Sequence, residues 1–420
     1  MEKVIALLAA IFVFSLCSPA KATLDAPPVV WQKTLGGSDS DYGRSVQQTT
    51  DGGFIIAGST HSFGEGYYGD VYLIKTDSAG NKIWQKTFGG SKDDSGDSVR
   101  QTTDGGFIIA GSTCTFREGS GDVYLIKTDP NGNSQWQKTL GGSKDDGGYS
   151  VQQTTDGGFI IAGGTQSFGA GRDVYLIKTD SAGNLVWQKT FGGENSDGGY
   201  SVQQTTDGGF IIAGYTYSFG AGGLDIYLIK TNPNGNSQWQ KTFGGSSNDC
   251  GYSVQQTADG GFIIAGGTQS FGAGSEDVYL IKTDSDGNEV WQKTFSGSDG
   301  DVGNSVQQTT DGGFIIAGST HSFGAGYYGD VYLIRTDSAG NLLWQKTFDG
   351  SSVDYGFSVQ QTADGGFIIA GCTSSFGAGN DDVYLVKVGF EGCERWDFNC
   401  DRSVDFFDFA EFAEHWLEEK

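Results

Sequence analysis

Residues 150–193 read SVQQTTDGGFIIAGGTQSFGAGRDVYLIKTDSAGNLVWQKTFGG, and this stretch decides the fold. It contains four short runs rich in β-branched and aromatic residues, separated by Gly, Asp and Asn. Such runs are typical of β-strands joined by tight turns, where Gly takes positive φ at little cost. We expect a first strand SVQQT, a second FIIAGGT, a third DVYLIKT and a fourth LVWQKTF. TDGG then joins the first strand to the second, and DSAGN joins the third to the fourth.

The same unit recurs along the whole chain of 420 residues. The tryptophan of its WQKT segment stands at positions 31, 84, 136, 187, 239, 291 and 344. A fixed period of this size indicates a repeat architecture. Seven units of four antiparallel strands predict an all-β fold, a seven-bladed β-propeller over residues 23–388.

The two ends of the repeat predict a closed ring. A fourth strand, residues 29–35, appears before any first, second or third strand. The last unit, residues 357–388, has the first three strands but no WQKT segment after them. We therefore expect residues 29–35 to pair as the outer strand of the last blade, which joins the ends of the ring and removes an open sheet edge.

The unit resembles a WD-repeat blade in its strand order, in the Asp-Gly of its first turn and in the Asp that opens its third strand. The Trp-Asp pair that ends the third strand in that family is replaced here by Lys-Thr-Asp or close variants. Residues 29–388 are also similar to secreted bacterial and archaeal repeat proteins, some of which belong to polysaccharide-degrading systems. These resemblances imply the propeller fold and make a polysaccharide an expected ligand class.

The loops of the ring fall into two groups. Adjacent strands alternate in direction, so the loops from fourth to first and from second to third strand share one face, here called the variable face. The turns from first to second and from third to fourth strand share the other, the constant face. TDGG or ADGG stays nearly unchanged in all units, whereas the loops from second to third strand differ. Because a binding face must differ around the ring, we place the candidate site on the variable face.

Two loops of the variable face repeat each other, HSFGEGYYG in the first blade and HSFGAGYYG in the sixth. In a closed ring they flank the seventh blade and its small loop, residues 374–381. The sequence predicts two aromatic walls around a low gap, formed by His61, Tyr67 and Tyr68 on one side and by His321, Tyr327 and Tyr328 on the other. Tyrosine offers a large flat area with a polar tip, which suits stacking on sugar rings. The alternative is recent duplication of one blade, with no function for the shared loop.

Other repeated side chains have structural interpretations. Two rings of Asp lie on the variable face, one in the GGSxxDxG segments and one at the start of the third strands. We expect these carboxylates to cap loop amides, with cation binding as the alternative. The repeated Trp is expected to fill space between blades. Tyr215 and Tyr217 in the fourth blade are a lesser ligand-binding candidate, with local packing as the alternative.

The N-terminal segment, residues 1–22, predicts a secretory signal peptide. Lys3 precedes an apolar run over residues 4–16, and Ala20-Lys21-Ala22 supplies a small-x-small cleavage site. The mature protein is therefore expected to be secreted or periplasmic, without a membrane-spanning segment; lipidation at Cys17 is the alternative. Five cysteines then remain, an odd number that leaves at least one thiol free or paired between chains. The net charge of -25 argues against nucleic acid as a partner.

The C-terminal segment, residues 389–420, differs from the repeat and contains ten acidic and three basic residues. Residues 397–408 read DFNCDRSVDFFD, and an amphipathic helix is expected after them. Oxygen ligands at two-residue spacing predict a calcium loop of the EF-hand kind. Its ligands are Asp397, Asn399, Asp401, Ser403, Asp405 and Asp408.

This loop and helix resemble one half of a type I dockerin, a family that docks enzymes onto cohesin domains. The resemblance implies a cohesin-like partner. Only one segment is present where a dockerin has two, and Arg402 replaces the usual Gly, which should weaken calcium binding. The alternative is a solvated acidic tail whose helix packs on its own chain.

The sequence favours a binding protein over an enzyme. It has only three His and no GxSxG, HExxH, P-loop or paired CxxC motif. Our leading interpretation is an exported, non-catalytic propeller that binds polysaccharide or an extracellular partner and carries a calcium-dependent docking tail. The first alternative is a glycoside hydrolase or polysaccharide lyase, which needs only two suitable carboxylates. Its candidate acids are Glu65, Glu118, Glu194 and Glu276. The second alternative is a structural or surface-assembly protein.

Overall fold

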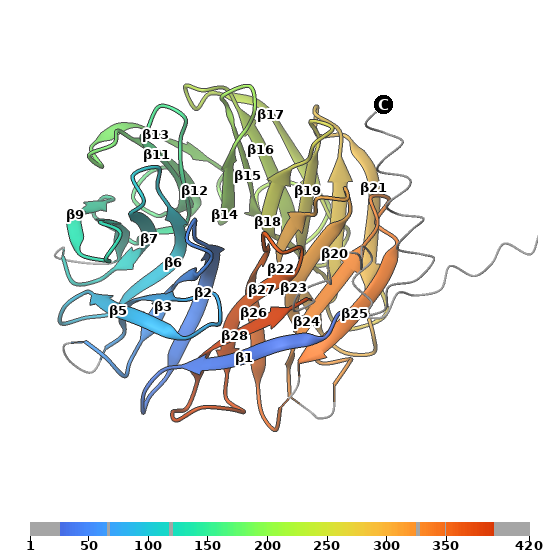
Figure 1. Cartoon of the computed structure of the whole chain (residues 1–420). Helices are drawn as coiled ribbons and strands as arrows, with labels where there is room; N and C mark the ends of the chain where they lie inside the picture. The colour runs from blue at the N-terminus through green and yellow to red at the C-terminus, as the bar shows by residue number, and fades with distance from the viewer. Residues whose placement is uncertain (1–25, 65–67, 117–120, 325–327, 349, 390–420) are drawn as a thin grey trace, which may run out of the picture.

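The computed structural model describes residues 26–64, 68–116, 121–324, 328–348 and 350–389. These residues form 28 strands in seven four-stranded antiparallel sheets (Figure 1). The prediction of an all-β, seven-bladed propeller is confirmed. The predicted signal peptide and the predicted calcium loop and helix lie outside the described residues. The described part of the chain contains no helix that could span a membrane.

The blades are numbered from the N-terminus, and each has the same four strands from the channel outward. The innermost strands are β2 (Asp41–Gln48), β6 (Asp94–Gln101), β10 (Asp146–Gln153), β14 (Asp197–Gln204), β18 (Asp249–Gln256), β22 (Asp301–Gln308) and β26 (Asp354–Gln361). The second strands are β3 (Phe54–Thr60), β7 (Phe107–Thr113), β11 (Phe159–Thr165), β15 (Phe210–Thr216), β19 (Phe262–Thr268), β23 (Phe314–Thr320) and β27 (Phe367–Thr373). The third strands are β4 (Asp70–Thr76), β8 (Asp122–Thr128), β12 (Asp173–Thr179), β16 (Asp225–Thr231), β20 (Asp277–Thr283), β24 (Asp330–Thr336) and β28 (Asp382–Val388). The outer strands are β5 (Lys82–Phe88), β9 (Ser134–Leu140), β13 (Leu185–Phe191), β17 (Ser237–Phe243), β21 (Glu289–Phe295), β25 (Leu342–Phe348) and β1 (Val29–Leu35).

The ring closes as the sequence predicts. β1 pairs antiparallel with β28 in blade 7, in a register that runs from Val29 opposite Val388 to Leu35 opposite Val383. Figure 1 shows this blue N-terminal strand lying against the red C-terminal strands. The first and last parts of the repeat therefore share one sheet, and the ring has no open edge at its junction.

The hydrophobic core lies between blades. The second and third strands are almost wholly buried, and alternate side chains point to the two neighbouring blades. One of the seven core clusters joins Ile368 and Leu385 of blade 7 to Phe54 and Tyr72 of blade 1. Each repeated Trp also contacts a Phe of the next blade, as Trp31 does with the ring of Phe54 at 5.9 Å between centroids. The repeated Trp therefore fills space between blades, as expected.

The first strands differ from the prediction in one respect. Each begins at the Asp of the GGSxxDxG segment and is eight residues long, whereas the sequence assigned that Asp to a loop. Gly43 permits this extension in blade 1, because a Cβ on it would lie 2.8 Å from Val383 of blade 7. A Gly-rich segment that suggests a loop is here a strand that packs closely against the neighbouring blade.

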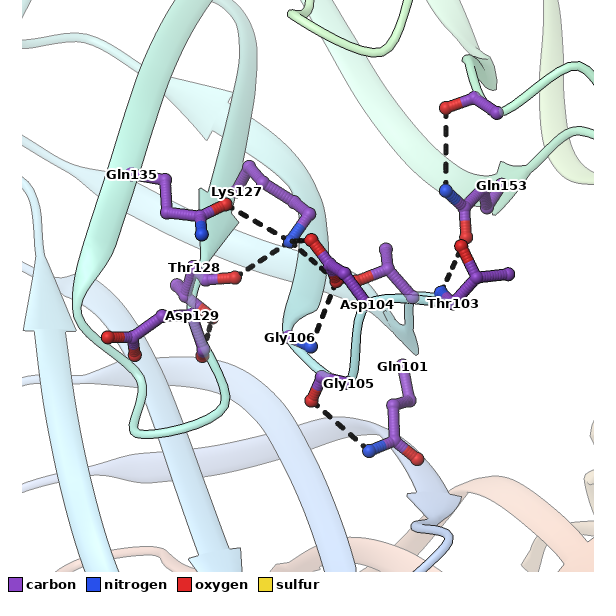
Figure 2. A network of polar contacts seen from close by, with 12 residues as sticks. Gln101, Thr103, Asp104, Gly105, Gly106, Lys127, Thr128, Asp129, Gln135 and Gln153 are labelled. Carbon is purple, nitrogen blue, oxygen red and sulfur yellow. Dashed lines mark hydrogen bonds and ion pairs between the residues drawn. The ribbon is translucent and has the colours of Figure 1, made fainter.

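The constant face repeats one ion pair in every blade. In blade 2, Lys127 of β8 is 4% exposed, and its Nζ donates to Asp104 Oδ2 at 2.9 Å and to the Thr128 carbonyl at 2.8 Å (Figure 2). Partial burial opposes ionisation of Asp104, but hydrogen bonds from Thr102, Lys127 and Gly106 outweigh it and lower its pKa to about 2. The equivalent pair in blade 6 uses Arg335 in place of Lys. The nearly unchanged TDGG turns therefore have a structural role.

Candidate functional site

A β-bulge in each innermost strand positions one side chain at the mouth of the central channel. In β2 the register passes from Gly43 to Ser45 and leaves Arg44 without a partner on β3. A bulge turns its extra side chain away from the regular alternation of the strand. The seven bulge residues, here called the mouth ring, are Arg44, Asp97, Tyr149, Tyr200, Tyr252, Asn304 and Phe357. Because the innermost strands contact one another around the ring, this set surrounds the channel near the variable face.

Tyrosines occupy one sector of the mouth ring. The ring of Tyr200 lies 5.7 Å from Tyr149 and 5.4 Å from Tyr252, measured between centroids. It also lies 5.5 Å from Tyr215, which in turn lies 6.4 Å from Tyr217. These five residues, here called the tyrosine cluster, span blades 3 to 5. Such tilted and edge-to-face arrangements are favourable for aromatic rings.

Burial favours the protonated form of three hydroxyl groups in the tyrosine cluster. Burial raises the pKa of Tyr149, Tyr200 and Tyr252 above the ordinary value. Arg172 Nη2 donates to the Tyr149 hydroxyl, while the Tyr217 side chain remains 47% exposed. The cluster therefore offers apolar ring faces together with neutral hydroxyls, the combination expected for contact with a sugar or another amphipathic ligand.

The remaining sector of the mouth ring is mostly polar. Arg44 Nε lies 3.5 Å from Asp97 Oδ1. Burial raises the pKa of Asp97, although the charge of Arg44 opposes this. Asn304 Nδ2 donates to the Gly356 carbonyl at 2.9 Å. The channel mouth is therefore asymmetric, with tyrosines over blades 3 to 5 and an ion pair over blades 1 and 2.

The two histidines of the predicted aromatic walls lie in separate cavities. His61 lines a cavity of about 520 Å³ with Tyr68, and residues from blades 7, 1 and 2 complete its wall. His321 lines a cavity of about 660 Å³ between blades 5 and 6. Each His Nδ1 lies 3.3 Å from the carbonyl of the loop that enters its own blade, Ser40 for His61 and Gly300 for His321.

Among the described residues, His61 and Tyr68 therefore do not line the same cavity as His321. Tyr68 and Tyr328 are exposed, with 50% and 53% of their surface accessible. Tyr67 and Tyr327 lie outside the described residues. The two histidines and Tyr217 occupy the same position of the unit, directly after the second strand, where the other blades carry Cys114, Gln166, Gln269 and Ser374. This position and the bulge position both vary from blade to blade.

One of the candidate acids lies in the cavity of His321. Glu276 lines this cavity together with Asp299. Burial, followed by the charges of Asp249 and Asp277, raises the pKa of Glu276. Glu194 is described but does not line this cavity, and Glu65 and Glu118 lie outside the described residues. A carboxyl with a raised pKa in a cavity is a feature of general acids.

The two rings of Asp have the structural role expected of them. Asp41 Oδ2 accepts hydrogen bonds from the Gly37 amide at 2.8 Å and from the Ser62 hydroxyl at 2.7 Å. Asp382 Oδ2 accepts from the amides of Ala378 and Gly379 at 2.8 Å and 3.1 Å. These carboxylates hold the loops of the variable face in place. Within the described ranges, no group of three or more His, Cys, Asp or Glu side chains is arranged to hold a metal ion.

The three cysteines of the described blades are free thiols. Cys114 and Cys250 are partly buried and Cys372 is buried. Burial raises the pKa of Cys250 to about 11 and that of Cys372 to about 12. The raised pKa values favour the protonated, less reactive form of these thiols at neutral pH. Cys393 and Cys400 lie outside the described residues.

Comparisons with known proteins support the fold but do not identify a family. No family model matches the chain. The regulatory protein FlaEY of Caulobacter vibrioides is 25% identical over 204 residues, which are 40% of this chain and 21% of that protein. The chain thus spans about a fifth of that relative.

Among solved structures, the Pan2 WD40 domain of Neurospora crassa matches with a TM-score of 0.53 and 11% identity, over 86% of this chain and 96% of that one. A chain from the structure of BBS1N in complex with ARL6DN matches with a TM-score of 0.49 and 10% identity, over 88% and 98%. At these identities the likeness to solved structures concerns the fold alone.

The mouth ring was missed by sequence reasoning. Its signal was nevertheless present, since the residue before the Ser-Val of each first strand reads Arg, Asp, Tyr, Tyr, Tyr, Asn and Phe around the ring. The bulge position was missed because the Gly-rich residues before Ser-Val were assigned to a loop.

Proposed function

We propose that this protein is an exported, non-catalytic binding propeller whose variable face binds a polysaccharide. The observation that carries the proposal is the tyrosine cluster beside the Arg44–Asp97 ion pair at the channel mouth. Tyrosine rings would stack on the apolar faces of sugar units, and the tyrosine hydroxyls and the ion pair would bond their hydroxyl groups. The chain of sugars would extend from the cluster toward the His61 or the His321 cavity.

A binding screen tests this proposal. Residues 23–420 are titrated with plant, algal and bacterial polysaccharides, with and without calcium. We expect at least one polysaccharide to bind and to remain bound after chelation of calcium.

The site is then tested with exchanges between blades. A variant with both Tyr200→Asn and Tyr217→Gln introduces the residues that blade 6 and blades 3 and 5 carry at these positions. We expect its affinity to fall about tenfold or more, since stacking of one ring is worth about 0.5–1.5 kcal/mol. Ile83→Ala is the matched control, because Ile83 is an exposed apolar residue on outer strand β5. Equal affinity of the exchange variant and the control would contradict the site.

The cavities test the extent of the ligand. His61→Ala and His321→Ala are compared separately, since the two side chains lie in different cavities. Loss of affinity in one variant gives the direction of the bound chain. Equal loss in both would support the arrangement that the sequence predicts, with His61, Tyr67, Tyr68, His321, Tyr327 and Tyr328 acting together.

Glu276 favours a second candidate function, glycoside hydrolysis or polysaccharide cleavage in the His321 cavity. The raised pKa of Glu276 suits a general acid, and Asp299 in the same cavity supplies a second carboxylate. Release of reducing ends from a bound polysaccharide, lost in Glu276→Gln, would establish this function. Binding without turnover favours the non-catalytic proposal.

The C-terminal segment is proposed to dock the protein to an extracellular partner of the cohesin kind in a calcium-dependent manner. Its support is the spacing of six oxygen ligands from Asp397 to Asp408. Calorimetric titration of the full chain with calcium should give one site that Asp397→Ala with Asp401→Ala removes. Unchanged calcium binding in this variant would refute the predicted loop.

A further inference from the structure

The end of the central channel near the constant face is lined by a ring of glutamines. In six blades a Gln Oε1 accepts the backbone N–H of a Gln in the next blade at 2.6 Å, as Gln47 does from Gln101. The six acceptors are Gln47, Gln152, Gln203, Gln255, Gln307 and Gln360. All six line one cavity of about 230 Å³.

These hydrogen bonds fix the orientation of the six side-chain amides. Because each Oε1 faces a backbone N–H, each Nε2 is turned away from that bond and keeps two donor hydrogens. No partner for these Nε2 atoms is recorded among the described residues. The cavity is therefore lined by groups that can donate hydrogen bonds to a ligand.

The seventh position of the ring is Arg100. A guanidinium has no acceptor atom, so Arg100 cannot receive the N–H of Gln153 as glutamine does in the other blades. By contrast, the adjacent ring of serines is complete, with every Ser Oγ accepting the N–H of a Val in the next blade. Blade 2 thus lacks the repeated hydrogen bond to the N–H of Gln153 and places a cation in the channel.

No carboxylate in the described part of the chain balances the charge of Arg100. Its recorded hydrogen bond runs from Nη1 to the carbonyl of Val99 at 2.9 Å, and no carboxylate of the described residues pairs with it. Burial lowers its pKa, and no neighbouring charge acts on it. Arginine remains charged at neutral pH even so.

We propose that this end of the channel binds a small oxyanion, with Arg100 and the glutamine amides as its ligands. The guanidinium can donate two parallel hydrogen bonds to a carboxylate, phosphate or sulfate group, and the Nε2 atoms can donate to the remaining oxygens. The cavity is smaller than the usual site of a drug-sized ligand, so it fits a small ion and not a polymer. This site is independent of the proposed polysaccharide face, because it lies at the other end of the channel.

The repeat supplies the matched variant for a test. Arg100→Gln installs the residue of the other six blades and should restore the acceptor for Gln153, so we expect it to fold. Thermal unfolding and calorimetric titration would compare both proteins in sodium phosphate, sulfate, acetate and chloride at equal ionic strength. Stabilisation that sulfate and phosphate give to any protein by exclusion from its surface appears equally in both.

The expected result is a specific shift in the natural protein alone. One or more of the three oxyanions should raise its Tm above the chloride value by several degrees more than in Arg100→Gln, and the Kd should rise at least tenfold in that variant. Arg100→Lys keeps the charge but loses the paired donors, and its affinity should fall between the two. Equal Tm shifts in the natural protein and Arg100→Gln, or no binding heat with any oxyanion, would overturn the proposal.

Discussion

The pKa of aspartate carboxyls is shifted in opposite directions on the two faces of the propeller. On the constant face, hydrogen bonds and a buried Lys or Arg lower the pKa of the turn carboxyls, to about 2 for Asp104 and Asp207. On the variable face, burial raises the pKa of Asp173, Asp225 and Asp277, and neighbouring carboxylates add to the effect. The turn carboxylates of the constant face are thus paired with cations, whereas these three aspartates of the variable face lie near other carboxylates.

This difference separates two uses of a repeat. The Asp–Lys pair of the constant face has the same task in every blade, so its residues hardly change. The mouth ring of the variable face changes from blade to blade, and only such change creates a sector of tyrosines beside an ion pair. Such asymmetry lets one sector of the ring contact a ligand differently from the rest. If this is correct, changes on the constant face should mainly reduce stability, and changes on the variable face should mainly reduce binding.

Removal of residues 29–35 should destabilise the whole ring, and this is the largest loss of stability that we expect. The deletion exposes β28 and removes Trp31 from the core cluster between blades 7 and 1. Trp31 is only partly buried, but the deletion also removes the pairing of a whole strand, so we expect Tm to fall by about 10 °C or more. Calorimetry of the deletion variant would check this. Thermal stability equal to that of the natural protein would show that β1 does not hold the ring together.

Lys127→Met should destabilise the constant face without touching the variable face. The variant leaves Asp104 and the Thr128 carbonyl without their shared donor, at an expected cost of about 1–3 kcal/mol in the free energy of unfolding. Lys127→Arg is the control, because blade 6 already carries Arg335 paired with Asp311. Urea unfolding of the three proteins would measure the difference. If Met and Arg variants were equally stable, the ion pair would have no stabilising role.

Acid should remove stabilising contributions of the constant face and destabilising contributions of the variable face, in different pH ranges. The folded pKa of Asp104 is about 2 against an ordinary value of 3.8, so its contribution is complete above 3.8 and is lost as pH falls toward 2. Asp277 has a raised folded pKa, so its ionised form is penalised at neutral pH. Protonation removes this penalty as pH falls through the raised pKa toward 3.8. Urea midpoints should therefore change little or rise slightly on mild acidification and then fall below pH 3.8.

Carboxyl NMR titration tests the same contrast at single residues. The signals of Asp104 and Asp156 should titrate near pH 2, and that of Asp277 above 3.8. Titration of all three at one common pH would remove the electrostatic difference between the faces.

Sequence patterns predicted most of the fold because the repeat supplies them seven times. The second, third and fourth strands, the role of the Trp residues and the closure by residues 29–35 all follow from the alternation of buried and turn residues. The bulge did not follow, since it interrupts this alternation at Gly43 and Arg44 with no change in composition. For the same reason the mouth ring was missed. The arrangement of His61 and His321 in separate cavities depends on the loop against which each imidazole packs, which the sequence does not specify.

Tyr217→Gln should have the smallest effect on stability and still impair binding. Tyr217 is 47% exposed, its recorded ring contact is with Tyr215, and blades 3 and 5 already carry Gln at this position. We expect the free energy of unfolding to change by no more than about 0.5 kcal/mol, as is usual for surface substitutions. Affinity for the bound polysaccharide should nevertheless fall several-fold. If the variant lost stability and kept its affinity, Tyr217 would be a packing residue, and the distinction between a stabilising face and a binding face would fail at that blade.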